Sequence, residues 1–157
     1  MKLKLLKDCL EEVPKEARLM GIDLGSKTIG IAISDAAQNL ATPITTIKRT
    51  KFSKDIVALG EIVEEFEIGG YIVGWPVNMD GTMGPRCDAT MSFVDEMLKR
   101  TDIVGEVPFI AFQDETLSTH AVDDFLDKSV NMSRKDRNEI IDKLAAQVIL
   151  QEALDSF

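Results

Sequence analysis

The sequence is poor in the residues and patterns that mark several large classes of protein. Its 157 residues include two cysteines, Cys9 and Cys87, and one histidine. The cysteines stand far apart in no ligand spacing, which indicates free intracellular thiols and argues against a zinc site. No apolar run reaches the roughly 18 residues of a membrane span, and the first residues lack the apolar core of a secretory signal. We therefore expect a cytoplasmic protein with no membrane partner.

Positive charge is also scarce. Eighteen Lys and Arg stand against 27 Asp and Glu, a net charge of −9. This excess of acid argues against a protein that coats nucleic acid by long-range attraction. It does not exclude a nuclease, because carboxylates can hold metal ions and basic groups can be local. The hydrophobic share of 45% is ordinary for a globular protein, and the length suits about one domain.

The hydrophobic pattern predicts an α/β fold. Two apolar runs, 19–24 and 28–34, flank a short glycine-containing loop and predict a β-hairpin. The further elements expected, in chain order, are strand 44–47, helix 52–66 ended by Gly69-Gly70, strand 71–74, helix 85–100, strand 107–112, helix 118–127 and helix 133–154. Antiparallel strands followed by alternating helices and strands imply a mixed sheet with helices on both faces. Residues 1–17 are lysine-rich and predict a short helix that ends near Pro14.

Three acidic residues follow predicted strands. Asp23 ends an apolar strand directly before a glycine, and Asp114 and Glu115 follow the strand 107–112. The carboxyl ends of strands are where α/β proteins usually bind ligands, although each of these acids could instead form a turn. Because successive side chains alternate, only one of Asp114 and Glu115 should face the same way as Asp23, and the sequence leaves open which one.

A fourth acid, Asp142, falls on the apolar side of the last predicted helix. On a helical wheel it lies among alanines and Ile149, opposite Lys143, Gln147 and Gln151. An unpaired carboxylate is costly to bury, and no Lys or Arg stands three or four residues away on that face. Its partner should come from the sheet, either as a metal ion or as a basic group in a structural salt bridge. Three acid sites from two strand ends and one helix would make the oxygen cage that Mg²⁺ or Mn²⁺ prefers.

Several residues are suited to contact phosphate. Lys27 stands beside the first acid, and the loop 76–86 opens a helix whose backbone N–H groups could receive an anion. Arg86 occupies the first turn of that helix, where a positive charge interacts unfavourably with the helix dipole. This position favours a binding role for Arg86. Two basic clusters, 48–54 and 134–137, could bind a phosphate backbone or could be solvated faces. The residues expected to contact nucleic acid are Lys27, Asn78, Arg86, Arg134, Lys135 and Arg137. Trp75 could stack on a base or pack in the core.

Four motifs follow one another between Leu19 and Asp155. They are Gly21-Ile22-Asp23-Leu24-Gly25 with Ile29-Gly30-Ile31-Ala32 and Ser34-Asp35; Val73-Gly74-Trp75-Pro76 with Asn78-Met79-Asp80-Gly81 and Gly84-Pro85-Arg86; Asp114-Glu115 with Ser118-Thr119 and Ala121; and Asp142-Lys143 with Ala145-Ala146 and Ile149-Leu150-Gln151. In this order they resemble the motifs of the YqgF family, the pre-16S rRNA nucleases that are also called Holliday junction resolvases.

The resemblance implies an RNase H-like fold, a five-stranded mixed sheet flanked by helices. Residues 1–157 would form one nuclease domain, with 1–17 as an N-terminal extension and 18–157 as the family core. It also implies a nuclease that uses a divalent metal, Mg²⁺ or Mn²⁺, with Asp23, Asp114, Glu115 and Asp142 as catalytic acids. The metal ligands would be Asp23, Glu115 and Asp142. The expected substrate is the 5′ end of pre-16S rRNA, with the small ribosomal subunit precursor as a partner.

Other functions remain compatible with the sequence. A branched DNA junction is the second substrate, and symmetric cutting of a junction favours a two-fold dimer; we expect a monomer or a weak homodimer. Thr116 stands where the family commonly has arginine after the Asp-Glu pair, which removes a cation near the site. A ribosome-assembly factor with the same fold that does not cleave is therefore a third reading. A lobe of a sugar-kinase or actin-like phosphotransferase is a fourth, because Asp23-Leu24-Gly25-Ser26 resembles their phosphate loop.

Overall fold

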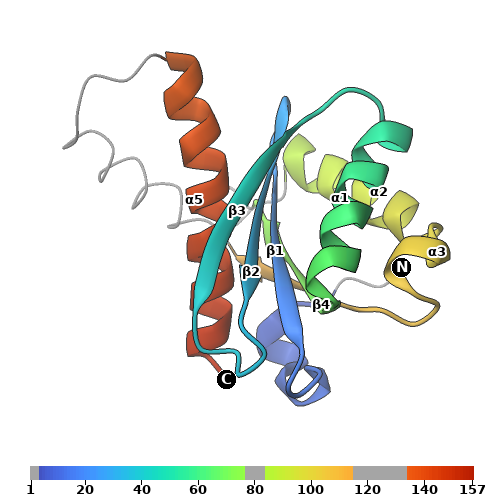
Figure 1. Cartoon of the computed structure of the whole chain (residues 1–157), viewed down its shortest axis with the longest axis vertical. Helices are drawn as coiled ribbons and strands as arrows, with labels where there is room; N and C mark the ends of the chain where they lie inside the picture. Colours follow the sequence, from blue (N-terminus) through green and yellow to red (C-terminus); the bar gives the residue numbers. More distant parts are fainter. Residues whose placement is uncertain (1–3, 77–83, 115–133) are drawn as a thin grey trace.

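A five-stranded sheet in the order β3-β2-β1-β4-β5 forms the centre of the computed structural model (Figure 1). The structure describes residues 4–76, 84–114 and 134–157, except for the side chains of 134–142. The strands are β1 (Arg18–Leu24), β2 (Thr28–Ser34), β3 (Ala41–Lys48), β4 (Ile68–Trp75) and β5 (Phe109–Asp114). β1, β4 and β5 are parallel to one another, and β2 pairs antiparallel with β1 and β3. The mixed five-stranded sheet is therefore confirmed.

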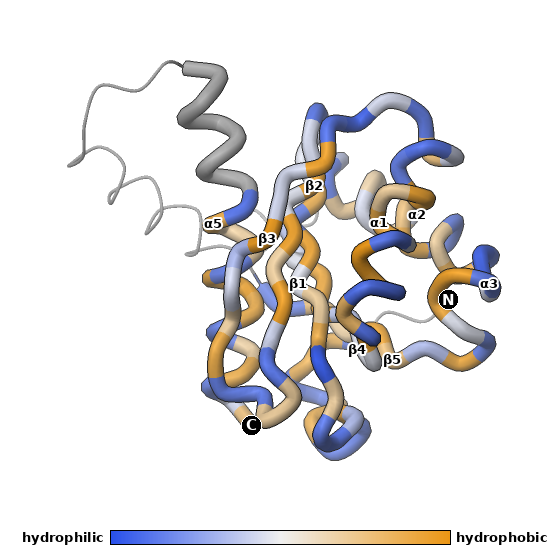
Figure 2. The backbone as a smooth tube through the Cα atoms, in the orientation of Figure 1, coloured by the Kyte–Doolittle hydropathy of each residue, from blue (hydrophilic) through white to orange (hydrophobic). Residues whose placement is uncertain are grey.

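Helices cover both faces of this sheet (Figure 1). On one face lie α1 (Phe52–Phe66), α2 (Pro85–Leu98) and the short α3 (Thr101–Val104), and α5 (Arg134–Asp155) lies on the other. Each face encloses its own apolar core, since alternate residues of every central strand belong to different clusters. In Figure 2 hydrophobic residues follow the strands between the layers, while hydrophilic ones gather at the turns.

α1 shows how local sequence sets one element. Ile56, Leu59 and Val63 recur at helical spacing and are buried. The helix stops where Glu67 turns into the left-handed region at φ 53°, and not at Gly69-Gly70 as the sequence predicted. The two glycines belong to β4, where Gly70 pairs with Leu19 of β1 and a Cβ at Gly70 would lie 2.8 Å from Cδ2 of Leu19.

Other element bounds differ from the prediction in ways that tertiary contacts explain. β3 begins at Ala41 and runs through Pro43, which a register shift accommodates on this edge strand. β5 occupies 109–114 instead of 107–112, and Val107 is 95% exposed. The second helix ends at Leu98 and the separate α3 follows it. The predicted helix 118–127 lies outside the described residues.

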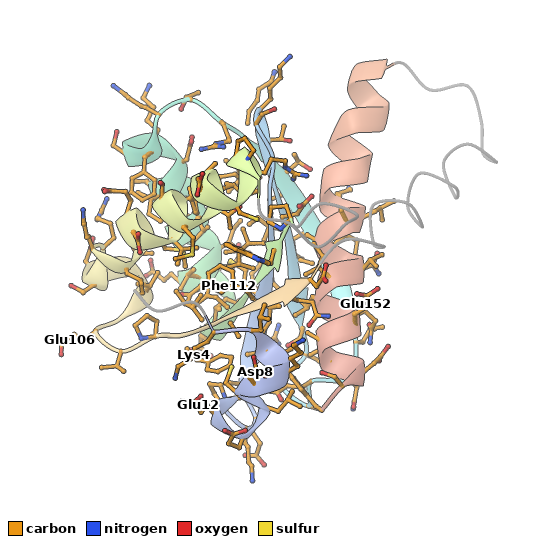
Figure 3. The ribbon with its side chains drawn as sticks, turned by 180° about the vertical axis from the view of Figure 1, so that it is seen from behind. Lys4, Asp8, Glu12, Glu106, Phe112 and Glu152 are labelled. Carbon is orange, nitrogen blue, oxygen red and sulfur yellow. The ribbon has the colours of Figure 1, made fainter. Side chains whose placement is uncertain are left out.

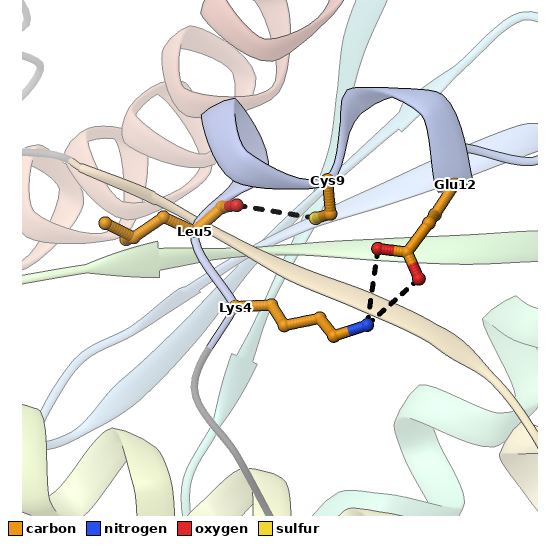
Figure 4. Close-up of polar contacts among 4 residues, drawn as sticks. All are labelled: Lys4, Leu5, Cys9 and Glu12. Carbon is orange, nitrogen blue, oxygen red and sulfur yellow. Dashed lines mark hydrogen bonds and ion pairs between the residues drawn. The ribbon is translucent and has the colours of Figure 1, made fainter.

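The N-terminal segment forms two 3₁₀ turns, Leu6–Asp8 and Leu10–Glu12, in place of the one short helix expected. Before them the carbonyl of Lys4 accepts the Phe112 N–H of β5 at 2.9 Å. Leu6 and Cys9 are buried in the core beneath α5. Figure 4 shows Lys4 Nζ paired with Glu12 at 2.9 Å and the Cys9 thiol donating to the Leu5 carbonyl at 3.4 Å. The segment therefore covers the outer edge of β5, which an edge strand otherwise leaves open to pairing. Among the described helices, none has the length and apolar character needed to cross a membrane.

Candidate active site at the carboxyl end of the sheet

The carboxyl ends of β1, β4 and β5 meet at one end of the sheet, because these strands are parallel. β3 runs in the same direction as β1, since both are antiparallel to β2, so its last residue Lys48 lies at this end too. In Figure 1 this is the end at which α5 begins. Ligands of open α/β sheets usually bind beyond the carboxyl ends of the strands.

Asp23 is a buried carboxylate on the face of β1 that α5 covers. Its exposed fraction is 7%. Met20, Ile22 and Leu24 point into the core beneath α1 and α2, whereas Leu19 belongs to the core beneath α5. Strand alternation gives Asp23 the orientation of Leu19. The strand acid singled out from the sequence therefore faces the helix that carries Asp142.

α5 lies unusually close to β1 just before this acid. A Cβ at Gly21 would stand 2.8 Å from the Cβ of Leu150 and 3.0 Å from the carbonyl oxygen of Ala146. The alanines of the helix are buried, as the helical wheel predicted. Gln147 and Gln151 also hold the helix to the sheet, since their side chains bond the carbonyl (3.2 Å) and the N–H (2.9 Å) of Ala41.

The expected acids beyond Asp23 are only partly described. Asp114 ends β5, is exposed and pairs in register with Trp75. Trp75 is in the core, edge-on to Phe112 at 5.3 Å between ring centroids, which settles its role as packing. Asp114 follows Phe112 by two residues, so alternation gives it the face opposite to that of Asp23. Glu115 lies outside the described residues, and Asp142 lies in α5 with its side chain outside them.

Two arginines bond the backbone directly after Asp23. Arg49 donates from Nη1 to the carbonyl of Gly25 at 2.7 Å, and its own N–H bonds the carbonyl of Lys27 at 2.9 Å. Its guanidinium lies 6.0 Å from the ring centroid of Phe93 in α2. Arg86, in the first turn of α2, donates to the carbonyl of Leu24 at 3.4 Å. Both guanidinium groups are thus held beside the loop that follows the acid.

The sequence did not single out Arg49 from its basic cluster, because its partners at Gly25 and Phe93 are distant in the chain. Lys27 is exposed in the tight β1–β2 turn, which the Gly25 N–H closes on the carbonyl of Thr28 at 2.8 Å. Asn78 lies outside the described residues, as do the side chains of Arg134, Lys135 and Arg137. Within the described part no three metal-ligating side chains form a group, and two of the three predicted ligands fall outside that part.

A family model described as "Holliday junction resolvase" (RuvX) matches residues 17–156. The chain belongs to the RuvX family. This is the YqgF family that its four motifs resemble. Membership confirms the expected class of enzyme, a nuclease that hydrolyses phosphodiester bonds.

Named relatives and solved structures agree with this assignment. The chain is 45% identical over 155 residues to a protein of Rhodospirillum centenum, with 99% of the chain and 82% of the relative covered. It is 48% identical over 149 residues to a protein of Methylocella silvestris, with 94% and 88% covered. Both carry the name "Putative pre-16S rRNA nuclease".

Two solved structures share the fold at low sequence identity. Thermus thermophilus RuvC in complex with a Holliday junction substrate has a TM-score of 0.54 at 12% identity, covering 89% of this chain and 94% of that one. The fowlpox virus resolvase in complex with junction DNA has a TM-score of 0.51 at 12% identity, covering 88% and 97%. The fold is therefore RNase H-like, as predicted.

Proposed function

We propose that the protein is a divalent-metal-dependent nuclease that processes the 5′ end of pre-16S rRNA. The observation that carries the proposal is Asp23, a carboxylate only 7% exposed at the carboxyl end of β1, on the face that α5 covers. A carboxylate at this end of an open α/β sheet lies where ligands bind, and its oxygens suit a divalent cation. The name that relatives in two bacteria carry supports rRNA as the substrate.

The donor set suits a hard divalent cation. Asp23, Glu115 and Asp142 would offer only carboxylate oxygens, which Mg²⁺ and Mn²⁺ prefer over nitrogen and sulfur. The orientation of Asp114 toward the α1–α2 side favours Glu115 as the ligand from this pair. A divalent cation bound there would supply a nucleophile from water at neutral pH and would stabilise charge at the phosphorus.

Backbone geometry supports Asp142 as the ligand from the helix. α5 runs antiparallel to β1 in Figure 1 and contacts Gly21 at Ala146. One helical turn from Ala146 to Asp142 advances roughly 6 Å. The two residues from Gly21 to Asp23 advance roughly 6.6 Å in the same direction. The backbones of Asp23 and Asp142 therefore lie at about the same position along the direction of β1, on two elements in close contact.

The basic groups beside the acid would hold the substrate. Arg86 and Lys27 lie at the loop after Asp23 and would contact phosphate oxygens flanking the scissile bond, fixing the strand without reading its sequence. Arg49, bonded to Gly25, would keep this loop in place. In this proposal the chain acts as one domain, as a monomer or a weak homodimer, on the small ribosomal subunit precursor.

Cleavage of a four-way DNA junction is the second candidate function, favoured by the description of the family model. The two can be separated by incubating the protein with a 5′-extended 16S rRNA precursor and with a DNA junction, side by side. Each reaction is run with Mg²⁺, with Mn²⁺ and with a chelator, using wild type and Asp142→Asn. We expect metal-dependent cutting of the RNA that the variant loses.

Preference for the junction, together with a dimer in solution, would replace the first function by the second. A folded wild-type protein that cuts neither substrate would contradict both and favour an assembly factor that does not cleave. Cutting that persists in chelator would contradict the role of the metal.

A further inference from the structure

Four lysines crowd the end of the molecule that carries Asp23. Lys27 lies in the β1–β2 turn, Lys48 ends β3, and Lys51 and Lys54 stand at the start of α1; all four are exposed. Together they form what we call the lysine surface. In Figure 3 long side chains that end in nitrogen project from this end of the sheet and of α1.

The lysine surface is attached to the loop that follows the acid. Lys48 pairs with Thr28 across the β2–β3 ladder. The next residue, Arg49, bonds the carbonyl of Lys27 through its N–H at 2.9 Å and the carbonyl of Gly25 through its side chain at 2.7 Å. Lys27 and Lys48 are therefore carried by backbone that is bonded to the loop following Asp23.

None of the four lysines has an acidic partner among the described side chains, whereas two lysines elsewhere are paired. Lys4 pairs with Glu12 and Lys99 with Glu96, both at 2.9 Å. Among the residues with described side chains, no carboxylate lies within 4.0 Å of any lysine of the surface.

The neighbouring sequence offers these lysines few carboxylates. It has no acid between Asp35 and Asp55. Asp55 is only 4% exposed and its carboxylate accepts the N–H (3.0 Å) and the hydroxyl (3.2 Å) of Thr50. A chain with a net charge of −9 thus keeps four exposed lysines next to its candidate active site, none of them paired with a carboxylate of the described part.

We propose that the lysine surface binds the phosphate backbone of the substrate and leads the strand across the β1–β2 turn to Asp23. This inference rests on the proposed function and adds the side from which the substrate enters. Flexible ammonium groups act as point charges for phosphate, so the contact would supply affinity and orientation for any sequence. Each neutralised phosphate releases counterions, which makes this part of the affinity dependent on salt.

The test compares two triple variants that each make the net charge more negative by three, from −9 to −12 in the wild-type background. One is Lys48→Gln/Lys51→Gln/Lys54→Gln. The control is Lys7→Gln/Lys15→Gln/Lys99→Gln, which removes three exposed lysines away from this end. The dissociation constant for a labelled single-stranded RNA taken from the precursor end is measured over a range of salt concentrations, with metal present and with the Asp23→Asn background to prevent cutting.

Three lost contacts should reduce the salt slope by about 2 and weaken binding roughly 10- to 100-fold near 0.1 M salt. The control should bind like the wild type. In the wild-type background, the single-turnover cleavage rate at saturating enzyme should be unchanged by the lysine substitutions, because they do not touch the acids.

An unchanged salt slope in the first variant, or an equal loss in the control, would overturn the lysine surface while leaving the nuclease intact. Lysine-dependent binding by a wild-type protein that never cleaves would support the surface as a nucleic-acid contact and overturn the proposed nuclease. Failure of the wild type to bind the RNA at all would overturn the surface.

Discussion

Replacing Gly21 with alanine tests whether the close contact between β1 and α5 is needed for the site. The added Cβ would lie 2.8 Å from the Cβ of Leu150 and 3.0 Å from the carbonyl oxygen of Ala146. Carbon atoms in optimal contact are about 3.5–4.0 Å apart. Neither obstacle can rotate away, because one is a Cβ and the other is backbone. α5 must therefore move outward by several tenths of an ångström or more.

The cost of this movement can be bounded. Overpacking a well-packed core costs about 1–3 kcal/mol, and replacing a glycine within a strand returns about 0.5–1 kcal/mol. We expect Gly21→Ala to lower the free energy of unfolding by about 1–2 kcal/mol, so that a protein of ordinary stability stays folded. A misplacement of about 1 Å can reduce catalysis roughly 10²-fold. The cleavage rate should therefore fall roughly 100-fold while the protein stays folded.

Two measurements check this prediction. Denaturant unfolding can be followed by the fluorescence of Trp75, the single tryptophan, which is 5% exposed in the sheet. Metal-dependent cleavage is measured on the same preparations. The matched control is Gly60→Ala in α1, where the three atoms nearest to the added Cβ belong to the side chain of Ile103 at 3.2–3.3 Å, a less severe approach than at Gly21. The control should keep both stability and activity.

Wild-type stability in Gly21→Ala would refute the tight contact. Lost stability with full activity would refute the claim that the distance between α5 and β1 governs the site.

Three further predictions concern the core. Burial raises the pKa of Tyr71, the single tyrosine, to about 12, and the phenolate absorbance of the folded protein should titrate near that pH. Because the ordinary pKa is about 10, the free energy of unfolding should fall as pH rises from 10 toward 12, by about 1.4 kcal/mol at pH 11. Tyr71→Phe should not show this loss. Leu6→Ala should lower the free energy of unfolding by about 2–5 kcal/mol, because Leu6 is buried against the sheet edge. Leu40→Ala, at an exposed position, should change it by less than about 0.5 kcal/mol. Equal effects would contradict the packing of the N-terminal segment. Burial also raises the pKa of the Cys9 thiol. Both Cys9 and Cys87 should react with a thiol reagent only as fast as the protein unfolds. Fast reaction of the native protein would show that the thiols are accessible.

Residues with local causes could be predicted from the sequence. The spacing of apolar residues predicted α1 over 52–66, because an amphipathic stripe depends only on the helical period. The β1–β2 hairpin followed from two apolar runs around Gly25. The position of Asp23 at the end of a buried strand was visible in the sequence and is confirmed, and its role in the site stays a prediction.

Features set by distant contacts could not be predicted. Gly69-Gly70 is typical of a helix stop, yet the pair lies in β4, where an added Cβ would meet Ala17 at 2.7 Å or Leu19 at 2.8 Å. The N-terminal residues resemble a helix locally but bond the edge of β5, a partner more than 100 residues away. Arg49 looks like one of several solvated cations, and only the fold shows its bond to Gly25.

The most direct test of the account is the single-turnover cleavage rate of Asp23→Asn on the preferred substrate with Mg²⁺, at saturating enzyme. The control is Glu64→Gln, which makes the same chemical change at an exposed position of α1. Loss of a metal ligand at the centre of the site should reduce the rate by at least about 100-fold while RNA binding persists. Cleavage by a folded Asp23→Asn protein at the rate of the control would contradict the assignment of this end of the sheet as the active site.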